Sequence, residues 1–510
     1  MMLTINHQAL SSLIEDDKHR DKLVEGLIEI TAVCKLIPSQ HDKFTQIVYD
    51  GISFILLRLS KERFTNLLNS QLLLDNNAAS NQRLLHLVKD MPVLYKLGQT
   101  IARNKNIDQQ FRDTLIKLEN GLKTTQVKSL MPLIQQELNK HIALYSIEID
   151  KTLLSEASVA AVVGFTWNEP ATNKETNGVL KIIKQHIPKY LNEEIKLINE
   201  LALYYEDNKN KYILNNFKFI ETLKELTEIL SKEVNLNNEQ LHLQTALNYY
   251  SKDQNIKIPK LYDFSTNHIT GMEKINGAKI TDAALTPKQK LLCCQILTKV
   301  FICNCLFSNQ EVTIFHADPH AGNIFATVEN SETIKIALLD WSIMGRLSIN
   351  LRRLIIKLAL ALIAQDAAKI YNSISSLSEY EIDNKNEILN IINDFIEDTN
   401  TVNLIKHFFH NALNIIDRIA LKGIKFPKDL LIYRKSLFTV TDIINELSSD
   451  FNIDEYIIEY TMELTFQEMP YRLSNMFLPI KDSPLNYKSL ISNRDMYNLG
   501  SKMLLNMLTG

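Results

Sequence analysis

Residues 314–346 decide the fold of this chain, and they read IFHADPHAGNIFATVENSETIKIALLDWSIMGR. Two apolar runs rich in β-branched residues, 324–328 and 333–339, flank the polar tetrapeptide ENSE at 329–332. Apolar runs on either side of a polar, turn-like segment are typical of a β-hairpin. The stretch therefore predicts two paired strands, with polar residues gathered before the first strand and after the second.

Three of those polar residues have a spacing that suits phosphoryl transfer. Asp318 and Asn323 lie five positions apart in one loop, and Asp340 follows the second strand. Phosphoryl transfer needs a carboxylate near the attacking oxygen, and oxygen ligands for Mg²⁺ on the β- and γ-phosphates. We assign the catalytic role to Asp318 and the Mg²⁺ to Asn323 and Asp340. A His-x-Asp-x4-Asn segment followed by Asp is the pattern of kinase-like folds.

A kinase-like site also needs a cation on the phosphates, usually a strand lysine held by a helix glutamate. Lys181 lies in the strand-like segment GVLKII at 178–183. We choose Glu233 as its partner, although Glu225 and Glu228 belong to the same predicted helix. Lys181 is thus predicted to bind the α- and β-phosphates, and Glu233 to orient it.

The segment upstream of Lys181 contains no glycine-rich phosphate loop. EASVAA stands there instead, at residues 156–161, and places Ala157 and Ser158 where glycines would be expected. Glycines let a backbone approach phosphates closely, whereas alanines add methyl groups and stiffen the turn. We expect a nucleotide to fit, with a phosphate geometry unlike that of an ordinary protein kinase.

Composition and element order indicate an α+β protein. The 510 residues are 45% hydrophobic and 23% charged, with a net charge of −3, which excludes nucleic-acid binding by bulk charge. Only 13 glycines and 12 prolines occur, which favours long helices. Helices come first, then a small β-containing region, then a long helical region that contains the hairpin. That order suits a two-lobed, mostly helical enzyme with a helical N-terminal extension.

The cysteines and the apolar runs indicate which cellular compartment to expect and whether the chain crosses a membrane. Five cysteines occur, four of them between residues 293 and 305, which predicts free buried thiols in a reducing compartment. No run of about 18 apolar residues is present, so no transmembrane helix is expected. The N-terminus lacks the features of a signal or transit peptide.

From about residue 90 to 465 the chain resembles the UbiB-type (AarF-like, ADCK) atypical protein-kinase-like family. Residues 316–324, HADPHAGNI, are close to that family's hallmark, with Ala321 where proline is usual. Further matching positions are Lys96, Gly98 and Gln99 for a Lys-x-Gly-Gln motif, Ala157 and Ser158 for an Ala-rich loop, Lys181 for the strand lysine, and Met272 and Glu273 for the hinge.

The resemblance implies a bilobal protein-kinase-like fold that binds Mg-ATP or Mg-ADP and has ATPase-like activity. It implies that Ala157, Ser158, Met272 and Glu273 contact the nucleotide. It also implies a regulatory role for the Lys-x-Gly-Gln segment, which in the family covers the site where a protein substrate would bind. From the same resemblance we expect a cytoplasmic chain at the periphery of a membrane, with lipids or quinone-pathway proteins as partners. The expected regions are 1–85 N-terminal helices, 86–150 Lys-x-Gly-Gln extension, 151–280 N-lobe, 281–470 C-lobe and 471–510 tail.

Several departures from the family pattern keep other interpretations open. Asp340-Trp341-Ser342 stands in place of Asp-Phe-Gly, and Thr227 and Ile229 stand where a Glu-x-Asp pair would precede Glu233. One alternative is a pseudokinase scaffold that binds nucleotide and partner proteins without phosphoryl transfer. Another is a small-molecule phosphotransferase, which would share the His-x-Asp-x4-Asn pattern.

Overall fold

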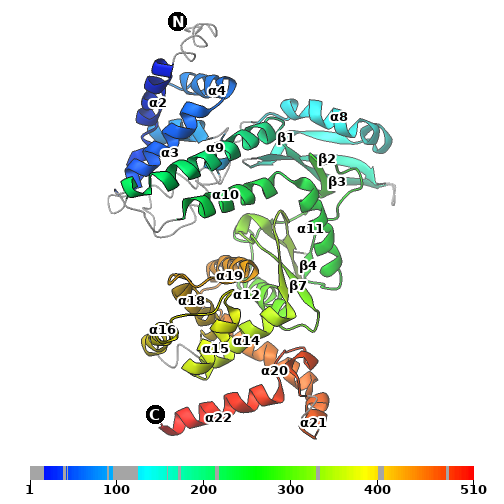
Figure 1. Ribbon diagram of the computed structural model, residues 1–510. Coiled ribbons are helices and arrows are strands. Elements are labelled where there is room, and N and C mark those ends of the chain that lie inside the picture. Colours follow the sequence, from blue (N-terminus) through cyan, green and yellow to red (C-terminus); the bar gives the residue numbers. More distant parts are fainter. Residues whose placement is uncertain are drawn as a thin grey trace. The chain divides into compact units, whose positions relative to one another are not determined.

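The computed structural model shows two compact units, each containing helices and strands (Figure 1). Unit 1 comprises Met1–Gln240 and Leu261–Lys274, and unit 2 comprises Leu241–Lys260 and Ile275–Gly510. The predicted α+β class is confirmed, whereas the five-part division of the chain stays a prediction. The structure describes residues 17–37, 42, 44–88, 91–95, 125–157, 159–169, 174–212, 218–328, 333–399, 407–477 and 482–509.

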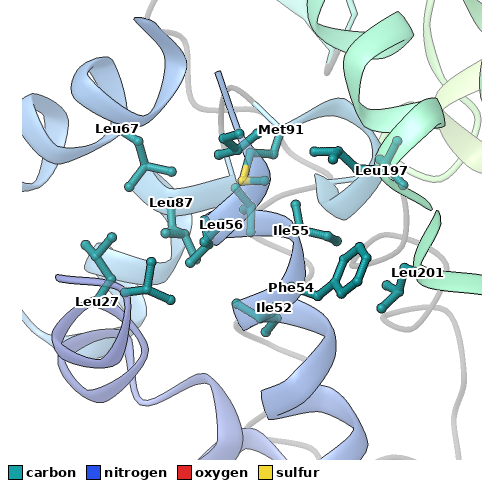
Figure 2. Packing of buried hydrophobic residues seen from close by; sticks show 14 of the residues in the cluster. Leu27, Ile52, Phe54, Ile55, Leu56, Leu67, Leu87, Met91, Leu197 and Leu201 are labelled. Carbon is teal, nitrogen blue, oxygen red and sulfur yellow. The ribbon is translucent and has the colours of Figure 1, made fainter. Parts of the chain in front are cut away.

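The N-terminal helices of unit 1 pack against the long helix α9 (Ile187–Asp207) around one apolar core (Figure 2). Leu56 and Phe64 are fully buried in it, and Leu197 and Leu201 enter from α9. Apolar residues three and four positions apart form the buried face of each helix, as the sequence predicts. The N-terminal helices are α2 (Asp17–Thr31), α3 (Thr45–Arg58), α4 (Lys61–Leu72) and α5 (Ser80–Val88).

A four-stranded antiparallel sheet forms the rest of the core of unit 1, with strand order β1-β2-β3-β5 among the described residues. Helix α8 (Val127–Tyr145) packs on one face, where Phe165, Trp167, Tyr262 and Phe264 cluster. The edge strand β1 was not predicted, because most of its side chains are exposed and it lacks apolar alternation. The strands are β1 (Glu148–Glu156), β2 (Ala160–Glu169), β3 (Lys174–Ile183) and β5 (Ile269–Glu273).

The predicted helix that carries Glu225, Glu228 and Glu233 is α10 (Phe219–Glu233), and a second helix, α11 (Leu236–Tyr249), follows it. The break falls at Val234 and Asn235, and the Asn235 side-chain oxygen accepts a hydrogen bond from the Asn238 backbone N–H at 3.2 Å. An asparagine in that position caps a new helix, because it satisfies one of the otherwise unpaired N–H groups.

Unit 2 confirms the hairpin predicted from residues 314–346. Strands β8 (Ile324–Val328) and β9 (Ile334–Leu338) are antiparallel partners inside a sheet of order β4-β9-β8-β6. A separate pair joins β7 (Val312–His316) to β10 (Met344–Ser348), where Gly345 lies against the Phe315 ring with no room for a Cβ atom. A short strand that needs a glycine is hard to recognise from sequence. The four-stranded sheet that contains the hairpin is completed by β4 (Ile256–Lys257) and β6 (Ala278–Lys279).

A continuous helical segment at Pro287–Leu306 passes through the core of unit 2 as α12 (Pro287–Thr298), the π-helical turn Lys299–Cys303 and α13 (Asn304–Leu306). Among the described residues it is the one helix long and apolar enough to cross a membrane, whereas none was expected from the sequence. Its most apolar stretch is 67% buried inside the protein. The cysteines are free, as predicted, and burial raises the pKa of Cys293 and of Cys305 to about 12.

The remaining helices of unit 2 extend into the tail, which the sequence patterns left unassigned. Arg472 is almost fully buried there, and its guanidinium donates to Glu468 at 2.7 Å and to the Ile491 carbonyl at 3.0 Å. The bond from Arg472 to Ile491 ties α21 (Met469–Phe477) to the segment that precedes α22 (Asn493–Thr509). The helices are α14 (Ile349–Ile363), α15 (Ala367–Leu377), α16 (Lys385–Asp398), α18 (Phe408–Ala420), α19 (Lys428–Leu447), α20 (Ile453–Gln467), α21 (Met469–Phe477) and α22 (Asn493–Thr509).

Candidate functional site

Unit 1 contains a buried lysine held by both oxygens of one carboxylate. The Nζ of Lys181 on β3 lies 2.8 Å from each carboxylate oxygen of Glu239 on α11. The side chains are 12% and 4% exposed, respectively, so the pair is largely shielded from solvent. A strand lysine held in this way by a helix glutamate is the arrangement that kinase-like folds use to hold phosphates.

Backbone and side-chain contacts around Glu239 fix that pairing. Glu239 lies in the first turn of α11, where the helix dipole favours a negative charge. The neighbouring Gln240 donates to the hydroxyl of Thr270 at 3.0 Å. Thr270 is in turn the residue on β5 that pairs with Lys181 on β3. The helix and the strand are thus joined next to the ion pair.

The choice of Glu233 as the partner of Lys181 is corrected by this contact, since the acid that the structure describes beside the lysine is Glu239. Glu233 ends α10, and its side chain lies outside the described residues. The new helix begins after the Asn235 cap, a signal that is readable from the sequence. The Glu-x-Asp pair is expected six and four residues before the glutamate that holds the lysine. Counted from Glu239 instead of Glu233, these positions are Glu233 and Asn235, so a Glu-x-Asn pair stands there.

The turn at Ala157 is held by the residues on either side of it. The N–H of Ala157 donates to the Ala160 carbonyl at 2.8 Å, while Ser158 lies outside the described residues. Glu156 forms an ion pair with Lys184 at 2.8 Å and accepts a hydrogen bond from the Thr125 N–H at 3.1 Å. Burial raises the pKa of Glu156, but the contacts from Lys184 and Thr125 outweigh it and lower that pKa to about 2. No motif in the sequence pointed to this ion pair.

The structure tests neither the predicted hinge nor the predicted regulatory segment. Met272 and Glu273 end β5 and pair with Val179 and Gly178 on β3, and their predicted nucleotide contact stays a prediction. Lys96, Gly98 and Gln99 lie outside the described residues, so their regulatory role also stays a prediction.

The loop of unit 2 that contains Asp318 is organised by a buried neutral histidine. His316 is almost fully buried, and burial lowers its pKa. Its Nε2 lies 2.7 Å from the Leu339 carbonyl, and its Nδ1 lies 3.3 Å from the Asp318 N–H. These partners suit the tautomer that carries its proton on Nε2. His316 therefore joins the loop before β8 to the end of β9.

Asn323 is held by the same loop. The side-chain amide nitrogen of Asn323 donates to the Asp318 backbone carbonyl at 3.2 Å. The backbone carbonyl of Asn323 accepts from the Leu339 N–H at 2.8 Å. The amide nitrogen is thereby used inside the loop, and the amide oxygen is the side-chain atom suited to a hard cation. The side chain of Asp318 is 19% exposed, and its Oδ1 lies 3.9 Å from Lys435 Nζ.

Asp340 has an unusual backbone conformation, with φ at 55°. Aspartate adopts this left-handed region more readily than most residues, yet such positions are strained and gather at functional sites. The next residue, Trp341, is fully buried, and its ring donates to the Leu338 carbonyl at 3.1 Å. Because the positive φ falls on Asp340 and not on Ser342, this loop does not require the glycine of an Asp-Phe-Gly motif.

Asn323 and Asp340 together form a donor set that fits Mg²⁺. The pairing of Ile324 with Leu338 places both residues at the same end of the hairpin. One carboxylate and one amide oxygen are the hard ligands that Mg²⁺ takes when phosphates and water supply the rest. No cluster of three or more His, Cys, Asp or Glu side chains suited to a metal occurs in the part of the chain that the structure describes.

The chain is similar to a protein family, to several curated proteins and to a solved structure. The family model of the ABC1 atypical kinase-like domain matches residues 117–374, half of the chain. A probable protein kinase UbiB of Actinobacillus pleuropneumoniae serotype 5b is 26% identical over 291 residues, which is 55% of this chain and 51% of that protein. The probable protein kinase UbiB of Photobacterium profundum is 27% identical over 289 residues, with 55% and 50% covered.

The chain spans about half the length of the curated relatives it matches. Among solved structures, the Rv3197–erythromycin complex from Mycobacterium tuberculosis is similar with a TM-score of 0.45 and 14% identity. That match covers 76% of this chain and 95% of the other.

Proposed function

We propose that this chain, which belongs to the ABC1 atypical kinase-like family, binds ATP or ADP with Mg²⁺ and hydrolyses ATP or transfers its terminal phosphate. The observation that carries the proposal is the partly buried Lys181, held at 2.8 Å by both oxygens of Glu239. A cation placed in this way can neutralise phosphate charge without reorganising during the reaction.

Each residue of the site has a separate task in this proposal. Lys181 binds the α- and β-phosphates and Glu239 orients it. Asp318 accepts the proton of the attacking group or positions that group. Asn323 and Asp340 hold the Mg²⁺, which supplies charge neutralisation on the phosphates when bound. Lys96, Gly98 and Gln99 regulate access to the site.

The family resemblance extends the proposal to isoprenoid quinone or other lipid metabolism. The relatives are named as probable protein kinases, which supports a kinase-like activity in those proteins. We place the chain in the cytoplasm at the periphery of a membrane, with lipids or quinone-pathway proteins as partners.

A pseudokinase scaffold is the second candidate. The observation that favours it is the 3.9 Å approach of Lys435 Nζ to Asp318, which places a cation beside the proposed catalytic carboxylate. A cation in that position competes with an attacking group for contact with the carboxylate. In that case the chain would bind nucleotide and partner proteins without turnover.

A thermal-shift measurement with ATP and ADP, with and without Mg²⁺, tests nucleotide binding directly, since a ligand of the folded state raises the melting temperature. Steady ATP turnover that is abolished in Asp318→Asn would support the enzyme and exclude the scaffold. A Mg²⁺-dependent shift without turnover would support the scaffold. Absence of any shift would overturn both.

A further inference from the structure

Unit 2 contains an apolar cavity of about 390 Å³ between α14, α18, α20 and the beginning of α22. Ala359 and Ile363 of α14 line one side, and Met462 and Phe466 of α20 line another. Among the described residues that line the cavity, the two polar ones are Thr461 and Thr465. The volume lies within the usual range of small-molecule sites.

Both threonines direct their hydroxyl donors to their own helix. The Thr461 hydroxyl donates to the Ile457 carbonyl at 2.7 Å, and the Thr465 hydroxyl donates to the Thr461 carbonyl at 2.8 Å. Such bonds within a helix leave mainly methyl groups toward the surroundings. The lining therefore offers apolar contact and little to recognise a polar ligand.

The cavity opens at the surface along α20. Ile458, Met462 and Phe466, spaced four residues apart, line it and are 39%, 56% and 67% exposed. Large apolar side chains left exposed in a row mark a binding surface rather than a random solvent-facing pattern. Methionine adapts its shape readily, so this wall can follow a flexible ligand.

An acidic row runs beside the apolar one. Glu455, Glu459 and Glu463 are exposed, and each precedes a residue of the apolar row by three positions, which makes them neighbours on the helix surface. Three carboxylates at the opening disfavour a ligand with a negative head group, and they equally disfavour an anionic bilayer.

The size of the cavity limits the ligand. A cavity of roughly 150 Å³ accommodates benzene, so this one has room for about 15 carbon atoms. We propose that the cavity binds one hydrocarbon chain of about that length, or somewhat shorter, whose head group carries no negative charge. The inference does not depend on the nucleotide site.

Calorimetric titration of the full chain with hexyl, octyl and decyl glucoside, each below its micelle-forming concentration and without nucleotide, tests this proposal. Each pair of added methylenes should tighten binding by about fifteenfold, because both are buried in the cavity. Decanoate should bind at least about threefold more weakly than decyl glucoside, and Glu459→Gln with Glu463→Gln should narrow that difference.

Two matched variants locate the binding. Phe466→Glu places a charge in the opening and should weaken decyl glucoside binding by at least about tenfold. Leu473→Glu makes the same kind of change on α21, at a residue that is 50% exposed and does not line the cavity, and should leave binding unchanged. Ala359→Phe fills the cavity from α14 and should block binding independently, with thermal unfolding as the check that each variant folds.

Affinity that does not rise with chain length would overturn the proposal, and so would equal affinity in Phe466→Glu and Leu473→Glu. A dimer in sedimentation that dissociates in Phe466→Glu would identify a second copy as the occupant and also overturn it. Association with neutral vesicles without binding of monomeric glucosides would overturn it in favour of a membrane surface. None of these results would bear on nucleotide binding, which is measured separately.

Discussion

The cation site of unit 1 and the acidic loop of unit 2 are held in place by different means. Lys181 on β3 is held by the side chain of Glu239 on α11, which is 58 residues away in the sequence. Asp318, Asn323 and Asp340 lie within one short stretch, where backbone bonds such as Leu339 N–H to the Asn323 carbonyl hold them. Local spacing was therefore enough to find the acidic loop, whereas the partner of the lysine required the tertiary structure.

The largest expected effect concerns the anchor of the acidic loop. Trp341→Ala should cost about 3–5 kcal/mol in the free energy of unfolding, because it empties a fully buried site. Its ring packs against His316, with centroids 4.8 Å apart, so the loss should reach the Asp318 loop. Chemical denaturation measures the cost, and Trp341→Phe should lose less. An unchanged denaturation midpoint in Trp341→Ala would show that backbone bonds alone hold this loop.

Asp340→Asn separates charge from backbone conformation in the same loop. Asparagine tolerates the positive φ, so the fold should persist while a charged Mg²⁺ ligand is lost. ATP turnover should fall by about 100-fold, and the Mg²⁺-dependent thermal shift should disappear. Asp366→Asn is the control, because Asp366 caps α15 in the same unit and has no role in the proposed site. Equal turnover in wild type and Asp340→Asn would remove Asp340 from the site.

Glu239→Gln and Glu233→Gln test the long-range pairing of unit 1 directly. Glu239→Gln replaces a charged hydrogen-bond partner of Lys181 with a neutral one, which should reduce ATP turnover by about tenfold. Glu233→Gln should reduce it much less. Kinetics on both variants at saturating Mg²⁺ give the comparison, and the reverse order would restore Glu233 as the partner.

The smallest expected effect concerns the ion pair beside the Ala157 turn. Because the folded-state pKa of Glu156 is lowered to about 2, its ionised form contributes stability above the unfolded-state value near 4.5. That contribution is lost as the pH falls from about 5 toward 2. At pH 7, Glu156→Gln should cost on the order of 1–2 kcal/mol. Urea unfolding of both proteins across this pH range should show the difference shrinking, and a constant difference would contradict the assignment.

Several elements were predictable because their signals are local. The hairpin follows from two apolar runs around a polar turn, and the N-terminal helices from apolar residues three and four positions apart. Strand β1 and the helices of the tail gave no such signal. β1 is an exposed edge strand, and the tail is organised by the buried Arg472 and its contacts with distant residues.

From the sequence alone, element order predicted the α+β class, and short spacing singled out Asp318, Asn323 and Asp340 as a candidate set, while the family resemblance rested on the motif residues quoted for it. Only the tertiary structure decided that Glu239 holds Lys181, that Glu156 pairs with Lys184, and that helices far apart in the chain enclose an apolar cavity in unit 2. The physical reason is the same in each case. Burial strengthens pairings and closes cavities between residues that are distant in sequence, and burial is known only once the chain has folded.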